Sequence, residues 1–458
     1  MPRWFVGLLL VLVVALAVGF AFVVRPLVGV ATAYKAKTLC SEVFVARRPV
    51  ADATKSLEVD DLVGLRAIRA KVDETERTAS ARFALFAERE AHFDPTRGCT
   101  LQTRRSVTLA ARAIAPLSPP EPSGLAAPAR DSVDLLPPAK QRAMERVFNH
   151  AFSKRVEDQK RRTRAIVVMQ HGRVVAERYA DGIGPDTPLP GWSMAKSALS
   201  ALVGVAVRQG KLHLDAPAAL RAWSSPGDPR RRITVSHLLR MSSGLEFDEG
   251  ESNPSSDLLR MLYDEPDMEA FTAGKPLRGE PGARWKYSTG TTLILSRVLR
   301  EALGDDAYRN LPQRALFGPL GMTHAVLEAD ESGTWVASSY MYATAREWGR
   351  LGQLYLQDGV WNGTRILPEG WVTYTRTPAP AAPDSLYGAH FWLRSPAEYR
   401  GPPATLPPGI FQAVGHEGQF ITIVPTHDVV IVRMGRTRFP EAWAHDRFVA
   451  SVLAALQS

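Results

Sequence analysis

The sequence predicts an α+β domain over residues 140–458. Apolar strand patterns lie near both ends of this region: residues 165–179 form one predicted hairpin, and residues 420–433 form another. The long stretch between the two hairpins shows helical and loop patterns. Strands at both ends with helices between them favour one antiparallel sheet that joins the two ends of the domain. We expect this sheet to be flanked by helices and to carry an inserted, mainly helical subdomain.

The chain begins with an apolar segment. Residues Trp4 to Val24 carry no charge, and a helix of this length, about 30 Å, would cross the core of a bilayer. We predict that residues 1–30 are an uncleaved membrane anchor. A cleaved signal peptide is the alternative, because Ala31-Thr32-Ala33 resembles a signal-peptidase site. The expected location is a bacterial inner membrane, with the main domain on the periplasmic side.

A small N-terminal module is predicted over residues 31–112. It holds both cysteines of the chain, Cys40 and Cys99, and apolar spacing between residues 65 and 72 predicts a helix. Two cysteines in a translocated protein are a candidate disulfide, which would close a loop of about 60 residues and contribute about 3–4 kcal/mol. Two buried thiols in a cytoplasmic protein are the alternative. A proline-rich linker over residues 113–139 leads to the main domain.

The bulk composition narrows the classes of function. The 458 residues are 45% hydrophobic and 22% charged, which is typical of a folded globular protein. The net charge is +9 and the pI is about 9.6, but the basic residues are spread along the chain with no aromatic-interleaved basic stripe. We therefore expect no nucleic-acid partner. The histidines show no metal-ligand spacing, so no metal or cofactor is expected either.

Ser193-Met194-Ala195-Lys196 is the most informative motif of the chain. A serine and a lysine three residues apart share one face of a helix, and the apolar run from Ala198 to Val207 predicts that this helix is buried. A lysine in dry surroundings has a lowered pKa and can take the proton of a serine nucleophile. The alternative for Ser193 is an ordinary helix cap. Only 11 of the 56 basic residues are lysines, and Lys196 within an apolar helix needs an explanation.

A second motif places a tyrosine on a loop before another apolar helix. The sequence Tyr287-Ser288-Thr289 precedes the helical run from Leu293 to Leu299. Beside a lysine ammonium, the phenol of Tyr287 would ionise more easily and act as a base or a proton shuttle. The alternative is a tyrosine that is half-buried at a loop and has no chemical role.

The third motif, Gly415-His416-Glu417-Gly418-Gln419, leads directly into the strand from Phe420. A glycine at a strand edge lets a substrate approach the backbone, and the following amide can donate to a developing oxyanion. His416 lacks the second histidine of the H-E-x-x-H zinc motif, so a metal role is not expected. A solvated turn residue is the alternative for His416.

The order S-x-x-K, Y-x-(N/S/T) and H-x-G resembles the serine β-lactamase and penicillin-binding-protein superfamily, in which K-T-G is the usual third motif. The likeness covers roughly residues 145–455 and is closest to the class C-like branch, which contains esterases, D-stereospecific peptidases and aminohexanoate-oligomer hydrolases. It implies a class C β-lactamase-like fold. It also implies acyl transfer through an acyl-serine, without metal or cofactor.

The resemblance also implies roles for single residues. Ser193 is the nucleophile, Lys196 accepts or relays its proton, and Tyr287 is the partner base. His416 takes the place of the lysine of K-T-G beside Gly418. The backbone amides of Ser193 and Gln419 form the implied oxyanion hole. These implied assignments extend to Thr289, which stands in the substrate-binding position where β-lactamases usually have asparagine.

The implied function is hydrolysis of an ester or amide. The threonine at 289 and the histidine at 416 depart from the β-lactamase pattern and favour esterase or amidase activity. The expected substrates are small esters, peptides with D-amino acids or short amides, and the oligomeric state stays open. The alternative is a membrane-anchored, penicillin-binding-type sensor that accepts an acyl group without efficient turnover. An α/β-hydrolase elbow is excluded, because three prolines between residues 185 and 190 cannot form the central strand that it needs.

Overall fold

The computed structural model describes residues 24–60, 66–84, 86–103, 136–153 and 160–458, with a few isolated positions nearer the N-terminus. The predicted anchor, residues 1–30, lies outside the described residues except for residues 24–30 and a few isolated positions, and most of the predicted linker lies outside them too. Among the helices of the described ranges, none combines the length and the apolar character needed to cross a membrane.

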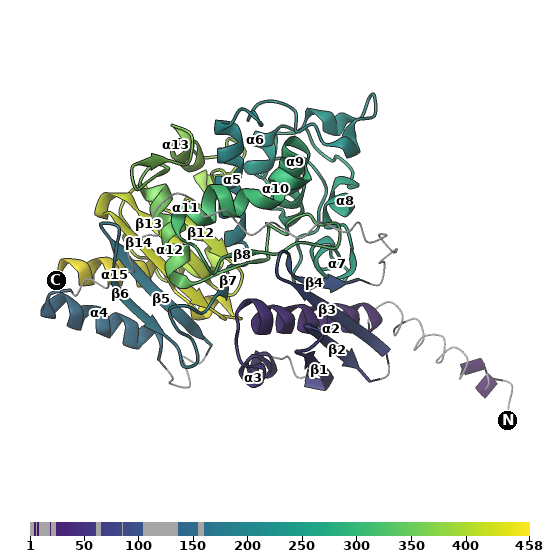
Figure 1. Cartoon of the computed structure of the whole chain (residues 1–458), viewed down its shortest axis with the longest axis horizontal. Coiled ribbons are helices and arrows are strands. Elements are labelled where there is room, and N and C mark those ends of the chain that lie inside the picture. Colours follow the sequence, from purple (N-terminus) through teal and green to yellow (C-terminus); the bar gives the residue numbers. More distant parts are fainter. Residues whose placement is uncertain are drawn as a thin grey trace.

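A five-stranded antiparallel sheet forms the centre of the main domain (Figure 1). The C-terminal strand β14 pairs with the first strand of the domain, β5, so that Val429 lies opposite Gln170. The sheet therefore joins the two ends of the domain, as the sequence predicts. In spatial order its strands are β12 (Phe411–Gly415), β13 (Gln419–Val424), β14 (Val429–Gly435), β5 (Thr163–Gln170) and β6 (Arg173–Tyr179).

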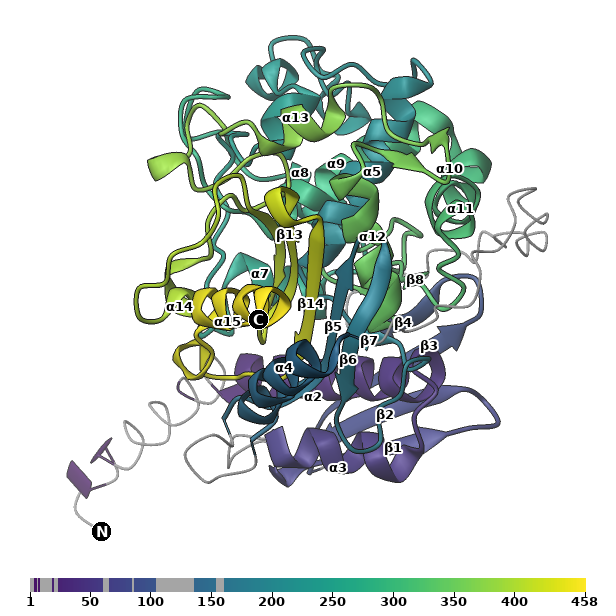
Figure 2. The same cartoon turned by 90° about the vertical axis from the view of Figure 1, so that its left-hand side faces the viewer.

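Helices cover both faces of this sheet. Ile166 and Val168 of β5 pack into an apolar cluster with α4 (Pro138–Ala151) and α15 (His445–Gln457), which lie side by side in front of the sheet in Figure 2. Alternate residues of a strand point to opposite faces. The neighbouring residues of β5 accordingly pack with α5 (Met194–Arg208) and α12 (Ala345–Leu356) on the other face. Burial on both faces explains why β5 is apolar along most of its length.

The region between β6 and β12 is mainly helical, as the sequence predicts, and α5 and α9 pack at its centre. Its further helices are α6 (Val235–Leu239), α7 (Asp257–Asp264), α8 (Met268–Ala273), α9 (Thr289–Leu303), α10 (Asp305–Pro312), α11 (Gly318–Leu320), α13 (Trp371–Arg376) and α14 (Ala397–Arg400). Two small antiparallel sheets lie in this region. One has three strands in the order β7 (Leu189–Pro190), β9 (Met341–Ala343) and β8 (Val326–Leu327), and the other pairs β10 (Val360–Trp361) with β11 (Thr364–Arg365).

The N-terminal module is a four-stranded antiparallel sheet with helices packed beside it. Its elements are α2 (Arg25–Cys40), α3 (Val50–Asp60), β1 (Ile68–Asp73), β2 (Thr78–Phe83), β3 (Phe86–Asp94) and β4 (Gly98–Gln102). The predicted helix around residues 65–72 is wrong, because Ile68 to Val72 lie in β1. Ile68, Ala70 and Val72 also alternate with polar residues, and pairing with β2 decides in favour of that strand pattern.

Helix α2 runs without a break from Arg25 to Cys40, across the predicted end of the anchor at residue 30. The candidate peptidase site at Ala31–Ala33 lies buried within this helix. At the other end, α4 begins at Pro138, slightly before the predicted start of the main domain.

The module is packed firmly against the main domain. Residues of α2 and of the module's sheet share one apolar cluster with Leu262 and Tyr263 of α7, with Tyr342 of β9 and with Tyr340 just before that strand. Polar contacts also cross the same interface, among them those of Arg89, Glu42 and Lys37. The two parts therefore form one continuous packed body.

Candidate active site

A sharp turn fixes the position of Ser193. Trp192 has a φ of 48°, and a Cβ added to Gly191 would lie 2.3 Å from the ring of Trp348, so the chain turns tightly before α5 begins. Ser193 occupies the cap position of α5, but its side chain makes no capping hydrogen bond. Instead, its Oγ accepts a hydrogen bond from Lys196 Nζ at 3.0 Å. An ordinary capping role therefore does not account for this serine.

Lys196 is buried, with 1% of its surface exposed. Its Nζ donates to Ser193 Oγ, to the carbonyl oxygen of Ser338 at 2.9 Å and to Thr289 Oγ1 at 3.3 Å. Burial lowers the pKa of Lys196 from 10.5 to about 8, although two nearby carboxylates oppose the shift. Roughly a tenth of the amine is therefore neutral at pH 7 and can accept a proton from Ser193.

Tyr287 lies beside the same pair of residues. Its side chain is hydrogen-bonded with Ser193, and Lys196 Nζ lies 5.0 Å from the centre of its ring. Burial raises the pKa of Tyr287 well above its usual value. This direction differs from the expectation that the lysine would help the phenol to ionise, because the loss of solvent outweighs the neighbouring amine. The ring packs against Trp392 and Tyr387, with centroid distances of 5.5 and 6.1 Å.

Thr289 connects the lysine to a carboxylate. It is the first residue of α9, which is capped by Ser288. Its backbone amide donates to Glu249 Oε2 at 2.9 Å, and its hydroxyl donates to Glu249 Oε1. Burial raises the pKa of Glu249, whereas Lys196 and the Thr289 hydrogen bonds lower it. The threonine therefore forms a hydrogen-bonded bridge between Lys196 and Glu249.

His416 lies in the tight turn between β12 and β13. Its ring meets Trp192 edge to face at 5.5 Å, and its Nδ1 lies 3.3 Å from Glu251 Oε2. The surroundings of the ring lower the pKa of His416, but its hydrogen bond with Glu251 and the charge of that residue raise it overall. Gly418 follows with a φ of 78°, and an added Cβ would lie 2.3 Å from Arg433 Nη1. This glycine is thus required by the turn itself.

Gln419 stabilises the same turn through its side chain. Its Nε2 donates to the carbonyl oxygens of His416 at 2.9 Å and Gly435 at 2.8 Å. A Cβ added to Gly415 would lie 2.1 Å from the carbonyl oxygen of Gly191, two residues before the predicted nucleophile. The turn between β12 and β13 is therefore held close to the start of α5. The oxyanion role of the Gln419 amide stays a prediction.

The structure thus brings Ser193, Lys196, Tyr287 and Thr289 into one hydrogen-bonded cluster, although they come from α5, from α9 and from the loop before α9. His416 lies next to this cluster and contacts it through Trp192, which precedes Ser193. Their chemical roles stay predictions. Within the ranges that the structure describes, no group of histidine, cysteine, aspartate and glutamate residues is arranged to hold a metal ion.

Sequence reasoning missed several residues of this site. Glu249 and Glu251 come from an irregular loop, and the carbonyl of Ser338 comes from a loop after β8. His390 is also buried, and its Nδ1 lies 3.0 Å from the carbonyl oxygen of Lys196. Burial lowers the pKa of His390 to about 3, so the ring is neutral. No spacing rule indicates these residues, because each approaches the site only through the fold.

Cys40 and Cys99, the candidate disulfide pair, are bonded to each other in the structure, with a Cα–Cα distance of 6.0 Å. The bond connects the end of α2 to the start of β4 within the N-terminal module. It lies outside the cluster around Ser193 and Lys196.

Comparison with known proteins identifies the family. The family model described as Beta-lactamase matches residues 148–455, about two thirds of the chain. The chain belongs to the β-lactamase family. The match contains all of the predicted site residues and excludes the N-terminal module. Membership of this family, together with relatives that are named hydrolases, makes the protein a serine hydrolase in the general sense.

Relatives of this β-lactamase-family chain differ in their named activities. The 6-aminohexanoate-dimer hydrolase of Paenarthrobacter ureafaciens is 23% identical over 300 residues, which are 61% of this chain and 74% of the relative. A penicillin-binding protein homologue from Caulobacter crescentus has a TM-score of 0.54 at 17% identity, covering 70% and 99% of the two chains. EstCE1, a hydrolase with promiscuous acyltransferase activity, has a TM-score of 0.53 at 16% identity, covering 70% and 100%. The two solved structures establish a shared fold.

Proposed function

We propose that this protein hydrolyses esters or amides through an acyl-serine formed on Ser193. The observation that carries the proposal is the contact of 3.0 Å between Ser193 Oγ and Lys196 Nζ, made by a lysine whose pKa is lowered to about 8. At pH 7, one unit below this pKa, roughly a tenth of the lysine is neutral and able to accept a proton. This fraction suffices for a positioned general base.

In the proposed first step, Ser193 Oγ attacks the carbonyl carbon of the substrate and its proton moves to Lys196 Nζ. The C–O bond to Ser193 forms as the carbonyl oxygen becomes an oxyanion. When the oxyanion collapses, the bond to the leaving group breaks, and the departing alkoxide or amine takes up the proton from Lys196 Nζ. Water then attacks the acyl carbon and gives a proton to Lys196 Nζ; collapse of the second oxyanion breaks the bond to Ser193 Oγ, which takes that proton back as the acid is released.

Tyr287 is proposed as a proton relay. Its raised pKa keeps the phenol protonated over the working pH range, so it acts as a neutral donor and acceptor. Its hydrogen bond with Ser193 lets it pass a proton between Lys196 and the leaving group. In this assignment Lys196 is the general base, and Tyr287 only passes the proton on.

The backbone amides of Ser193 and Gln419 are proposed to bind the oxyanion. The amide of Ser193 lies at the start of α5, where the helix dipole favours negative charge such as that of a developing oxyanion. The close approach of Gly415 to the Gly191 carbonyl supports the second donor, because it holds the turn before Gln419 beside that helix start. Thr289 and His416, which stand in place of asparagine and lysine, favour esters and short amides over β-lactams as substrates.

The proposal is tested with the full chain and a panel of p-nitrophenyl esters and D-amino-acid p-nitroanilides. We expect sustained turnover of at least one compound, labelling by a fluorophosphonate probe, and loss of both in Ser193→Ala with an unchanged circular dichroism spectrum. Turnover that survives in Ser193→Ala would exclude the mechanism. A single round of acylation with no turnover on the whole panel would favour the acyl-accepting sensor instead.

A further inference from the structure

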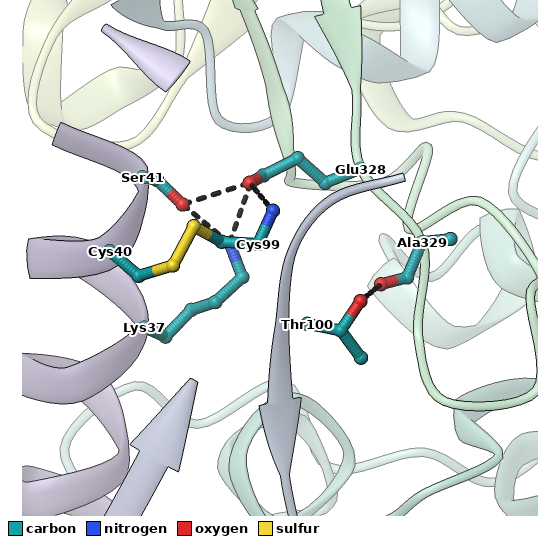
Figure 3. The surroundings of a disulfide bond; sticks show 7 residues. All are labelled: Lys37, Cys40, Ser41, Cys99, Thr100, Glu328 and Ala329. Carbon is teal, nitrogen blue, oxygen red and sulfur yellow. Dashed lines mark hydrogen bonds and ion pairs between the residues drawn. A yellow bond between two sulfur atoms is a disulfide. The ribbon is translucent and has the colours of Figure 1, made fainter. Parts of the chain in front are cut away.

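Glu328 is a fully buried carboxylate that follows β8, and its side chain is bound entirely by the N-terminal module (Figure 3). Lys37 Nζ donates to its Oε2 at 2.6 Å. Ser41 Oγ and the backbone amide of Cys99 donate to its Oε1 at 2.9 and 2.7 Å. These donors come from both ends of the Cys40–Cys99 disulfide, so the crosslink holds two sides of the carboxylate's binding site together.

The fit around this carboxylate is close. Gly98 precedes the bonded cysteine with a φ of +72°, and an added Cβ would lie 2.5 Å from Glu328 Cγ. Lys37 also lies over the ring of Tyr340, 4.1 Å from its centre. Burial lowers the pKa of Lys37, and Glu328 opposes this shift. The module therefore presents a preformed site, with a cation, a hydroxyl and an amide, that accepts this one side chain.

The segment that begins at Glu328 contacts Lys196. The amide of Glu328 donates to the carbonyl of Tyr340 at 2.9 Å, and the amide of Val336 donates to the carbonyl of Glu328 at 2.8 Å. These bonds fold residues 328–340 into a compact loop. Within that loop, the carbonyl of Ser338 accepts the hydrogen bond from Lys196 Nζ at 2.9 Å.

The same segment also supports the serine. Directly after the loop, the carbonyl of Met341 accepts a hydrogen bond from the amide of Gly191 at 2.9 Å. Tyr342 pairs with Pro190 of β7, the strand that ends just before Ser193. Residues 328–342 thus contact both Lys196 and the chain that leads into Ser193. On their other side they contact the N-terminal module.

We propose that Glu328 is a positioning residue, through which the N-terminal module holds the Ser338 carbonyl on Lys196 and the β9 strand behind Ser193. The module then helps to position the active-site residues, although it lies outside the part of the chain that matches the family. This inference rests on the proposed roles of Ser193 and Lys196. It assigns to the module a control over the rate of the reaction, separate from its contribution to stability.

The inference is tested with Glu328→Gln in the full chain, which keeps the shape of the side chain and removes its charge. We expect kcat at the high-pH plateau to fall at least fivefold, because Ser338 and β9 lose their support. The acidic limb of kcat/KM is expected to move up by about one pH unit, because water entering the loosened loop weakens the burial that lowers the pKa of Lys196. KM should change less than about threefold.

The charged and titratable groups that face Lys196 are unchanged in this variant. They are Glu249, Glu251, Tyr287 and His390. Asp264→Asn is the matched control. It breaks the Arg89–Asp264 ion pair of 3.0 Å across the same interface, but Asp264 belongs to α7 and not to the segment of residues 328–342. We expect this control to lower Tm while leaving kcat and the acidic limb unchanged. A folded Glu328→Gln protein with wild-type kcat and limb would overturn the inference.

Gly98→Ala provides a second variant if Glu328→Gln does not fold. Its added Cβ displaces Glu328 from within the module, far along the chain from the catalytic motifs. The same loss of kcat and the same shift of the limb support the inference, and wild-type values overturn it. Failure of the proposed function is distinguished by the wild-type protein itself, which would then show no turnover or would retain it in Ser193→Ala.

Discussion

Lys37 and Lys196 are both buried, with 3% and 1% of their surfaces exposed, yet their surroundings differ in one respect. Lys37 lies 2.6 Å from the Glu328 carboxylate, whereas Lys196 donates its hydrogen bonds to two hydroxyls and a carbonyl. A carboxylate in direct contact compensates a buried ammonium and makes it part of the structure. Burial lowers the pKa of both lysines, but only Lys37 has a carboxylate in direct contact that opposes the shift. The comparison explains why one lysine joins two parts of the protein and the other faces the nucleophile.

The largest expected effect is that of Lys196→Met on catalysis. Methionine fills the space of the lysine without its amine, so we expect turnover to fall by about 10³–10⁴-fold, within the range of a positioned general base. Thermal stability should be retained, because a buried amine with only neutral contacts is removed. Hydrolysis is measured at pH 8.5 together with Tm. Residual activity within tenfold of wild type would show that Lys196 is not the base.

Lys37→Met has its largest expected effect on stability. It leaves Glu328 buried without its cation, and breaking a buried ion pair costs about 3–5 kcal/mol. We expect the free energy of unfolding, measured by urea titration, to fall by that amount. The double variant Lys37→Met/Glu328→Leu, which removes both charges, should recover much of the loss. No recovery would mean that packing, rather than charge pairing, determines the contribution of this contact.

The Cys40–Cys99 disulfide is expected to stabilise the N-terminal module, to which Lys37 also belongs. Cys40→Ser/Cys99→Ser removes a crosslink between residues 59 apart in the sequence. Chain entropy then predicts a loss of about 4 kcal/mol in the free energy of unfolding. The measurement is urea unfolding of the variant and the oxidised wild type side by side. A change below about 1 kcal/mol would show that the packed interface alone orders the module.

Tyr287→Phe sharpens the role of the group beside Lys196. The substitution keeps the ring packed against Trp392 and removes only the hydroxyl. Loss of the relay is expected to lower kcat by about 10²–10³-fold with little change in Tm. Steady-state kinetics on the best ester of the panel measure the effect. A change of less than about twofold would remove Tyr287 from the catalytic group.

The smallest expected effect is the pH dependence of the wild-type enzyme. Since the pKa of Lys196 is lowered to about 8, kcat/KM should rise with pH and level off above pH 8. At pH 7 it should be roughly a tenth of the plateau value, because one unit below the pKa about a tenth of the amine is neutral. A profile that is flat between pH 6 and 9 would mean that the lysine is not titrating in the catalytic step.

Much of the fold could be predicted from the sequence. The apolar hairpins at residues 165–179 and 420–433 predict the antiparallel sheet. If both hairpins belong to one sheet, a strand from each must pair, as β5 and β14 do. The region around 65–72 is an instructive failure. Its apolar residues fit both a helical and an alternating pattern, and the neighbouring strand β2 decided between them.

The chemical motifs were predicted from local patterns, but their electrostatics were not. A spacing of three residues on a helix brings Ser193 and Lys196 to one face, so their contact is a local property. The direction of the pKa shift at Tyr287 depends on how much water the whole fold excludes, and it proved opposite to the expected one. Glu249, Glu251 and Ser338 have no local signature that would mark them as neighbours of Lys196.

The sequence by itself determined the sheet, the buried helix of the nucleophile and the order of the three motifs, because these depend on side-chain periodicity and short spacings. Only the tertiary structure decided that the N-terminal module contacts the segment beside the site. Lys37 and Glu328 are 291 positions apart along the chain, and no periodic pattern links residues at such a distance. Their contact exists because packing excludes water from both, and a buried charge then requires an opposite charge within reach.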